Sequence, residues 1–282
     1  MMKKSCFIAF LLLFTVVLNM NAGTRRALVI GLGKQMDTSW AKIHGDNDIY
    51  YVMQMLNQCG YTDIRTLKNE QATKQAIVKA FMDLANKCNK GDEVYIHYSG
   101  HGQLMTDLDG DEALRSTARH AQWDEAWIPY DAYMVYCEKD KGEKHLSDDE
   151  VAFYLESIRG KIGKKGKIMV VIDACHSGDA TRGETEECVR GIDVKFAVPK
   201  TGTEQGASEP TPEHWLTVSA CKPYQLCMEM KDFNIGKLTY ALHMLGKEVF
   251  SMSNKELQQR LDEFMEMNKG RLSQNPVVSG EK

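Results

Sequence analysis

Short apolar runs alternate along the chain with segments in which apolar residues recur every three or four positions. The runs have the length and the β-branched and aromatic content of buried strands, at Arg26–Gly31, Ile64–Leu67, Glu93–Ser99, Lys167–Asp173 and His214–Ser219. The recurring pattern is helical, at Asp46–Gly60, Glu70–Lys87, Asp148–Arg159, Gly236–Leu245 and Asn254–Asn268. Strands that alternate with helices in this way predict an α/β fold with a mostly parallel central sheet covered by helices on both faces.

Two long segments lack either period. Leu104–Tyr130 is acidic and reads as irregular, and Ala180–Pro212 is polar and rich in Gly, Pro, Thr and Glu. Loops of this length in a compact domain are usually functional or disordered. We therefore expect an irregular acidic loop in the first segment and a flexible loop in the second.

The start of the chain has the pattern of a secretory signal peptide. Lys3 and Lys4 precede an apolar stretch of 13 residues, Cys6–Leu18, and small residues follow at Ala22 and Gly23. Thirteen residues are too few to span a bilayer of about 30 Å as a helix. We expect residues 1–22 to be removed, leaving no stable membrane span, and the protein to be exported to the periplasm or the extracellular space. A retained anchor or a buried helix is the alternative.

Composition narrows the function classes further. The 282 residues are 43% apolar and 26% charged, which excludes a disordered or polytopic membrane protein. A net charge of −4 provides no basic field for nucleic acid. The absence of any Cys-x-x-Cys pair argues against zinc ribbons and thioredoxin-like sites. After the leader the cysteines are odd in number, which suggests a free thiol: Cys59, Cys88, Cys137, Cys175, Cys188, Cys221 and Cys227.

Two of the predicted strands end in residues that can do chemistry. Glu93–Ser99 runs into His101, and Lys167–Asp173 runs into Cys175. The carboxyl ends of parallel strands meet at one edge of the sheet, where ligands usually bind. An imidazole beside a thiol can deprotonate it and later protonate a leaving amine, and the Gly102 amide could hold an oxyanion. The alternatives are a histidine that only makes hydrogen bonds and a cysteine of the core.

Metal binding has weaker signals. His97 and His101 lie on one face of a strand rather than a helix, and the Glu of a helical zinc motif is absent, so zinc is disfavoured. The acidic stretch 107–112 resembles a calcium loop, but its Gly comes too early for an EF-hand. A solvated acidic loop explains it equally well.

The motifs YSGHG (Tyr98–Gly102) and DACHSG (Asp173–Gly178) together resemble those of the caspase-haemoglobinase clan, most closely its bacterial metacaspase-like members. The resemblance extends over most of the chain from Arg25 to the C-terminus. It implies a three-layer α/β/α sandwich and a cysteine endopeptidase with a His101–Cys175 dyad. It also implies an oxyanion hole formed by the amides of Gly102 and Cys175.

The same resemblance implies a preference for substrates with Arg or Lys before the scissile bond. The family's pocket for that side chain corresponds to Asp48, Ser99 and Asp173. Carboxylates suit a guanidinium, and the less favoured alternative for Asp48 is a carboxylate that caps a helix.

No cofactor is required by this chemistry, and calcium is a candidate ligand. Asp124 and Glu125 match part of the family's acidic site, whereas Arg182 stands where a further carboxylate is expected.

The domain prediction follows from the resemblance. Residues 23–282 form one peptidase domain, with a large-subunit-like part (23–179), the loop 180–212 and a small-subunit-like part (213–282). Arg182, Arg190, Lys195 and Lys200 make this loop a candidate for self-cleavage. The alternatives are an inactive binding or scaffold protein on the same fold and, less favoured, an amidase or acyl transferase with the same dyad.

Overall fold

The computed structural model describes residues 23–108, 110, 122–175, 188–199, 214–222, 225–270 and 272–281. The predicted signal peptide lies outside these residues. Among the described helices, none has the length and apolar content needed to cross a membrane.

A six-stranded sheet forms the centre of the molecule. Its strands stand in the order β11 (Val277–Gly280), β8 (Leu216–Ser219), β7 (Lys167–Asp173), β3 (Glu93–Ser99), β1 (Arg25–Gly31) and β2 (Asp63–Lys68). All neighbours are parallel except β11 and β8. The predicted parallel sheet is confirmed, and β3 and β7 are adjacent at its centre.

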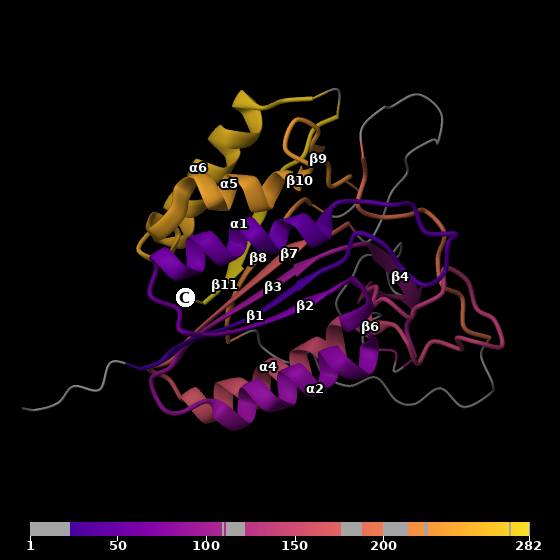
Figure 1. The fold of residues 1–282 in the computed structure, drawn as a ribbon, viewed down its shortest axis with the longest axis horizontal. Coiled ribbons are helices and arrows are strands. Elements are labelled where there is room, and N and C mark those ends of the chain that lie inside the picture. Colours follow the sequence, from indigo (N-terminus) through magenta and orange to yellow (C-terminus); the bar gives the residue numbers. More distant parts are fainter. Residues whose placement is uncertain are drawn as a thin grey trace, which may run out of the picture.

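Helices cover both faces of the sheet (Figure 1). One face carries α1 (Gly45–Gln58), α5 (Lys237–Leu245) and α6 (Asn254–Met267), and the other carries α2 (Lys74–Lys87) and α4 (Asp148–Ile162). Each layer buries its own apolar cluster against the sheet, with Phe81 and Leu155 on the second face and Leu56 and Leu261 on the first. This is the three-layer α/β/α sandwich that the resemblance implied.

Local capping sets some boundaries that periodicity alone places differently. The helix expected from Glu70 begins as α2 at Lys74, because the Thr73 hydroxyl accepts a hydrogen bond of 3.2 Å from the Ala76 amide. The residues before it form a short 3₁₀ helix, η1 (Asn69–Gln71), and a second one, η2 (Gly246–Phe250), follows α5.

The expectation of an irregular loop over Leu104–Tyr130 is wrong for its described ends. A small antiparallel sheet joins β4 (Gly102–Thr106), β5 (Trp123–Trp127) and β6 (Leu146–Ser147). Every residue of β4 is buried, so this strand has no exposed polar face to produce an alternating pattern. A two-stranded sheet, β9 (Glu229–Met230) with β10 (Ile235–Gly236), lies between β8 and α5 in sequence.

Residues 188–199 are packed into the domain, contrary to a flexible loop throughout 180–212. The Phe196 ring is buried, and its backbone exchanges hydrogen bonds with β4: its amide donates to Leu104 O (2.8 Å) and its carbonyl accepts from Thr106 N (3.0 Å). Arg190 is fully buried as well. The rest of the predicted loop lies outside the described residues.

Candidate active site

His101 and Cys175 follow the ends of two adjacent parallel strands. Ser99 of β3 is paired in register with Asp173 of β7, so each candidate residue stands two positions beyond that pair. The Gly100 amide also lies 3.4 Å from the Asp173 carbonyl oxygen. The topology therefore brings the two residues to one edge of the sheet, as predicted.

The His101 ring is buried and held in one orientation. Its Nε2 lies 2.8 Å from the Ala41 carbonyl oxygen, and the Trp40 ring packs against it at a centroid separation of 5.1 Å. A carbonyl can only accept, so Nε2 carries the hydrogen and Nδ1 presents a lone pair. Burial lowers the pKa of His101 to about 4, which keeps the ring neutral. Nδ1 is buried without a hydrogen-bond partner in the described part of the chain, so its lone pair is available to accept a proton.

Cys175 makes two contacts that define the site. Its backbone amide donates a hydrogen bond of 2.7 Å to the Arg190 carbonyl oxygen. Its thiol donates to the Gln225 carbonyl oxygen at 2.7 Å, on the side where Cys221 and Cys227 lie. Two amides are expected to hold an oxyanion, and that of Cys175 already donates to a carbonyl oxygen. The other belongs to Gly102, the first residue of β4, which is paired with Trp127 of β5.

The residues predicted to line an acidic pocket come together in the interior. The Ser99 hydroxyl donates a hydrogen bond of 2.7 Å to Asp48 Oδ2. Thr239 bridges the two acids, with its Oγ1 at 3.1 Å from Asp48 and 2.6 Å from Asp173. The helix-cap reading of Asp48 is wrong, because His44 is the N-cap residue of α1 and Asp48 lies inside the helix.

Arg190 occupies this pocket. Its Nη1 and Nη2 donate to the two oxygens of Asp48 at 2.6 and 3.1 Å, its Nε donates to Glu229 at 3.0 Å, and Asp173 lies 3.6 Å from Nη1. A side chain at Gly236 would stand 2.4 Å from Nη1, so the close approach of this wall requires glycine. Three carboxylates surround one guanidinium.

The charges in the pocket shift two pKa values. Burial tends to lower the pKa of Arg190, but Asp48, Asp173 and Glu229 outweigh it and hold the pKa well above the ordinary value. Burial raises the pKa of Asp173 to about 6, against the opposing effect of Arg190. The pocket therefore holds a guanidinium that stays charged, and the carboxyl groups around this cation outnumber it three to one.

Sequence reasoning missed two parts of this pocket. Glu229 carried no recognisable signal, and its carboxylate also accepts from the His44 amide (2.7 Å) and contacts His44 Nδ1 (2.6 Å). Arg190 was predicted only as one of several basic residues in a loop. Thr239, which lies in the segment predicted as a helix from Gly236, contacts both acids.

A buried histidine supports the pocket from behind. His97 has Nδ1 at 3.1 Å from the Tyr95 hydroxyl and Nε2 at 2.9 Å from the Ser99 hydroxyl. Ser99 donates its only hydrogen to Asp48, so it accepts from His97 Nε2. Burial lowers the pKa of His97 to about 4, and the ring is neutral. His97 thus orients Ser99 rather than binding zinc with His101.

Comparison with known proteins places this arrangement in a family. The family model described as "Caspase domain" matches residues 24–282. The chain belongs to the caspase domain family.

Relatives of this caspase domain include fungal metacaspases. Metacaspase-1 of Meyerozyma guilliermondii is 26% identical over 249 residues, which cover 84% of this chain and 52% of that protein. Metacaspase-1B of Aspergillus terreus is 30% identical over 169 residues, or 56% of this chain and 39% of that protein. The chain thus spans about half or less of the length of these relatives.

Solved structures share the fold of this caspase domain. A crystal structure of a Geobacter sulfurreducens protein matches with a TM-score of 0.62 at 18% identity, covering 92% of this chain and 94% of that one. Caspase-1 of Spodoptera frugiperda matches with a TM-score of 0.57 at 11% identity, covering 92% and 87%. The caspase-like fold is confirmed.

The two acids predicted to bind calcium lie on β5 of the caspase domain. Asp124 is buried and Glu125 half-buried, and successive residues of a strand point to opposite faces. Because their side chains point to opposite faces of the strand, the position of Asp124 and Glu125 on β5 does not by itself bring both carboxylates to one ion. Residues 111–121, which precede them, lie outside the described part of the chain.

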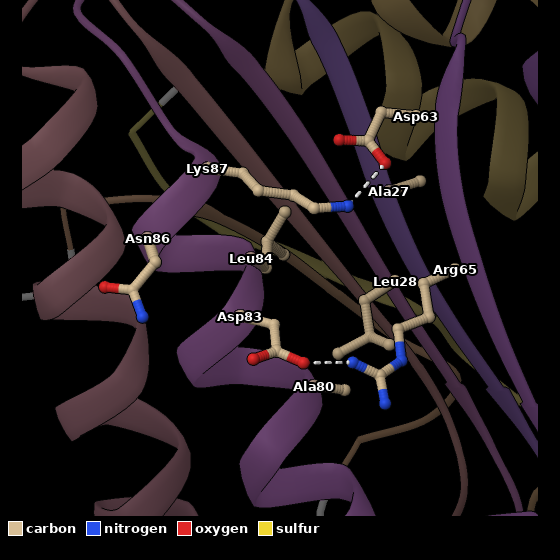
Figure 2. Close-up of a pocket in the computed structure, with 9 residues that line it drawn as sticks. All are labelled: Ala27, Leu28, Asp63, Arg65, Ala80, Asp83, Leu84, Asn86 and Lys87. Atoms are coloured by element: carbon tan, nitrogen blue, oxygen red, sulfur yellow. Dashed lines mark hydrogen bonds and ion pairs between the residues drawn. The ribbon is translucent and has the colours of Figure 1, made fainter.

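A separate surface hollow of about 290 Å³ lies between α2 and the edge of the sheet at β1 and β2. Figure 2 shows two ion pairs across it, Arg65 with Asp83 at 2.7 Å and Lys87 with Asp63 at 3.2 Å. Its lining contains no cysteine or histidine, and its charged residues are paired with each other, so we assign it no chemistry.

Proposed function

We propose that this caspase domain is a cysteine endopeptidase that hydrolyses peptide bonds after Arg or Lys, with His101 and Cys175 as its catalytic dyad. One observation carries the proposal: an arginine of the chain itself lies in the acidic pocket while its carbonyl oxygen accepts from the Cys175 amide. A substrate residue before a scissile bond needs both contacts at once. Its cationic side chain requires a carboxylate pocket, and its carbonyl requires a donor beside the nucleophile.

The reaction uses the two nitrogens of His101 differently. Nε2 stays on the Ala41 carbonyl and fixes the ring, while Nδ1 takes the proton of the Cys175 thiol. The thiolate attacks the substrate carbonyl carbon, and the amides of Cys175 and Gly102 stabilise the oxyanion. The protonated ring then gives its proton to the leaving amine. Water, deprotonated by His101, hydrolyses the thioester and releases the new carboxylate.

The thiol must turn before it can react. Its present acceptor is the Gln225 carbonyl, on the side of Cys221 and Cys227. Rotation about the Cα–Cβ bond of Cys175 between staggered rotamers redirects Sγ without moving the backbone amide. The described conformation is thus a resting state of the proposed enzyme.

We further propose that self-processing takes place at the Arg190–Gly191 bond. Arg190 fills the pocket, so a substrate arginine cannot enter until Arg190 leaves. Gly191 follows directly, and a side chain there would stand 2.4 Å from the Cys175 carbonyl oxygen. Of the other basic residues considered, Lys195 lies over the Trp123 ring at 4.3 Å, away from the pocket acids. Arg182 and Lys200 lie outside the described residues.

The test combines peptide turnover with intact mass. Fluorogenic peptides with Arg, Lys or Asp before the scissile bond are offered to wild type, Cys175→Ala and His101→Ala. We expect cleavage after Arg or Lys by wild type alone, because the dyad acts as a unit. Turnover by Cys175→Ala above a trace would contradict the nucleophile, and a folded wild type without turnover would favour the scaffold alternative.

Self-processing is followed in the same samples over time. Wild type should give two fragments that meet at Arg190–Gly191, and Cys175→Ala should give none. Arg190→Gln should remove this cut, while the matched variant Lys195→Gln should keep it. Equal fragmentation of wild type and Cys175→Ala would indicate a contaminating protease.

Two accompanying proposals concern the surroundings of the enzyme. Export through residues 1–22 is tested by N-terminal sequencing of secreted protein, with a start near Gly23 as the expected result. Calcium binding at Asp124 and Glu125 is tested by turnover in chelator and after calcium is restored. A loss that calcium reverses in wild type but not in Asp124→Asn would support that site.

A further inference from the structure

Three sulfur atoms lie together behind the predicted nucleophile. The Sγ atoms of Cys175, Cys221 and Cys227 are all within 4.8 Å of one another, and those of Cys221 and Cys227 are 2.8 Å apart. They come from three places in the chain: the end of β7, the residues after β8, and the approach to β9. Neither Cys221 nor Cys227 has a part in the proposed peptide hydrolysis.

The surroundings of the sulfurs favour uncharged sulfur. The thiols of Cys175 and Cys221 both point at the Gln225 carbonyl, at 2.7 and 3.3 Å, and that of Cys227 points at the Ala174 carbonyl at 3.0 Å. A carbonyl accepts from a thiol but repels a thiolate. Burial raises the pKa of Cys227, and the neighbouring Cys175 thiol raises that of Cys221.

This environment distinguishes between two possible roles of a thiol cluster, a metal site and a disulfide. A soft metal such as zinc would require several thiolates side by side next to carbonyl oxygens. A disulfide is neutral, and its sulfurs need only approach to about 2.05 Å. The close pair at 2.8 Å is therefore suited to form a covalent bond.

We propose that Cys221 and Cys227 are a dithiol that oxidises to a disulfide beside Cys175 and so diverts thiol oxidation away from the predicted nucleophile. The role given to Cys175 rests on the proposed function, whereas the sulfur chemistry does not. Cys221 is the half-buried member and the other two are buried, so an oxidant meets Cys221 first.

The reaction balances with a low-molecular-weight disulfide as oxidant. The Cys221 thiol loses its proton to water as its sulfur attacks one sulfur of glutathione disulfide, a mixed disulfide forms, and one glutathione thiolate leaves. The Cys227 thiol then loses its proton in the same way as it attacks Cys221 Sγ, and the second glutathione leaves as its thiolate. Two protein thiols are oxidised, one glutathione disulfide is reduced, and the two protein protons pass to the released thiolates. Without Cys227, the nearby Cys175 becomes the attacking thiol.

The experiment maps disulfides in the full chain. Reduced wild type, Cys227→Ser, Cys175→Ser and the control Cys88→Ser are incubated with glutathione disulfide, quenched with acid, alkylated in denaturant and digested without reduction. Mass spectrometry should show a Cys221–Cys227 link in wild type, in the control and in Cys175→Ser, with Cys175 alkylated where present. Cys227→Ser should instead show a Cys175–Cys221 link.

Peptide turnover provides the second readout. After the same oxidation, wild type should keep most of its activity, and Cys227→Ser should lose about tenfold or more, restored by dithiothreitol. Absence of the Cys221–Cys227 link in folded wild type, or Cys175 linked in wild type, would overturn the proposal. Zinc that protects all three thiols from alkylation while no disulfide forms would overturn it in favour of a metal site. The mapping requires no peptidase activity, so its outcome is independent of the proposed function.

Discussion

The backbone amide of Cys175 donates a hydrogen bond of 2.7 Å to the carbonyl oxygen of Arg190, 15 positions further along the chain. The Arg190 side chain extends from that point into the acidic pocket and reaches Asp48 and Glu229. Under the proposed function, the Arg190–Gly191 bond therefore lies where the scissile bond of a substrate would lie. Because the pocket is filled from within, the described conformation is closed to an external arginine.

The residue after Arg190 gives the first prediction. Gly191→Ala places a methyl group 2.4 Å from the Cys175 carbonyl oxygen and 2.9 Å from its Cβ, so this segment must move away from the site. We expect the cut after Arg190 to slow by about tenfold or more, a barrier increase of about 1.4 kcal/mol. An added Arg peptide should be cleaved as fast as by wild type or faster, because Arg190 then holds the pocket less firmly.

Intact mass and fluorogenic turnover measure the two rates separately. Gly160→Ala is the matched control, because a methyl group at that position of α4 meets nothing within 4 Å. It should leave both rates unchanged. A Gly191→Ala protein that processes itself at the wild-type rate would show that Arg190 is not cleaved from its observed position in the pocket.

The pocket acids give a second prediction, which is an ordering. Asp48→Asn removes the carboxylate that makes two hydrogen bonds to the guanidinium, whereas Asp173 stands 3.6 Å from the nearest nitrogen. Loss of a charge-assisted contact is worth about 1.5–3 kcal/mol, so kcat/KM for Arg peptides should fall by about tenfold or more in Asp48→Asn. The loss should be smaller in Asp173→Asn.

Asp46→Asn is the control for the first variant. Asp46 lies in the same first turn of α1 and pairs with Lys68 at 3.3 Å instead. It should leave Arg turnover near the wild-type value. Unchanged Arg preference in both Asp48→Asn and Asp173→Asn would remove these acids from the substrate pocket.

The parts of the site that the sequence predicts are those fixed by strand ends. His101, Cys175, Ser99 and Asp173 follow or close two apolar runs, and parallel pairing brings them to one edge. Asp48 was predicted from the resemblance, and its contact with Ser99 places it in the same pocket. These relationships need only the order of strands and the direction of each chain segment.

The parts that were missed depend on long-range ion pairing. Arg190 and Asp48 are 142 residues apart in sequence, and no period or turn signal links them. Glu229 lies in a strand of two residues, too short to leave a pattern. Similarly, β4 is buried on both faces and shows no alternation, so a segment that read as irregular is a strand.

A third prediction tests the wall of the pocket. Gly236→Ala would place a methyl group 2.1 Å from Asp173 Oδ2 and 2.4 Å from Arg190 Nη1. The narrower pocket should accept the slim Lys side chain better than the planar guanidinium of Arg. We expect the ratio of kcat/KM for Arg over Lys peptides to fall by about fivefold or more, the size of a contact worth about 1 kcal/mol. An unchanged ratio in a folded variant would place the guanidinium elsewhere.

The last prediction concerns stability against pH. Burial lowers the pKa of both His97 and His101 to about 4 in the folded chain, compared with about 6.5 in an unfolded one. Between these values the unfolded chain binds protons that the folded chain does not, so the free energy of unfolding falls as the pH drops from about 6.5 towards 4. Each histidine contributes a slope of up to about 1.4 kcal/mol per pH unit.

Asp173 acts in the opposite direction. Its folded pKa is raised to about 6, so its contribution is greatest at low pH and is lost as the pH rises through 6. Its effect on the free energy of unfolding offsets part of the pH slope contributed by one histidine. Urea unfolding of Cys175→Ala at pH 7, 6, 5 and 4 measures the net slope without self-cleavage. A further His97→Gln substitution, whose amide can still contact Tyr95 and Ser99, should flatten that slope by about one proton. An equal slope with and without His97 would mean that this ring binds protons equally in the folded and unfolded chains, so that its pKa is not lowered by folding.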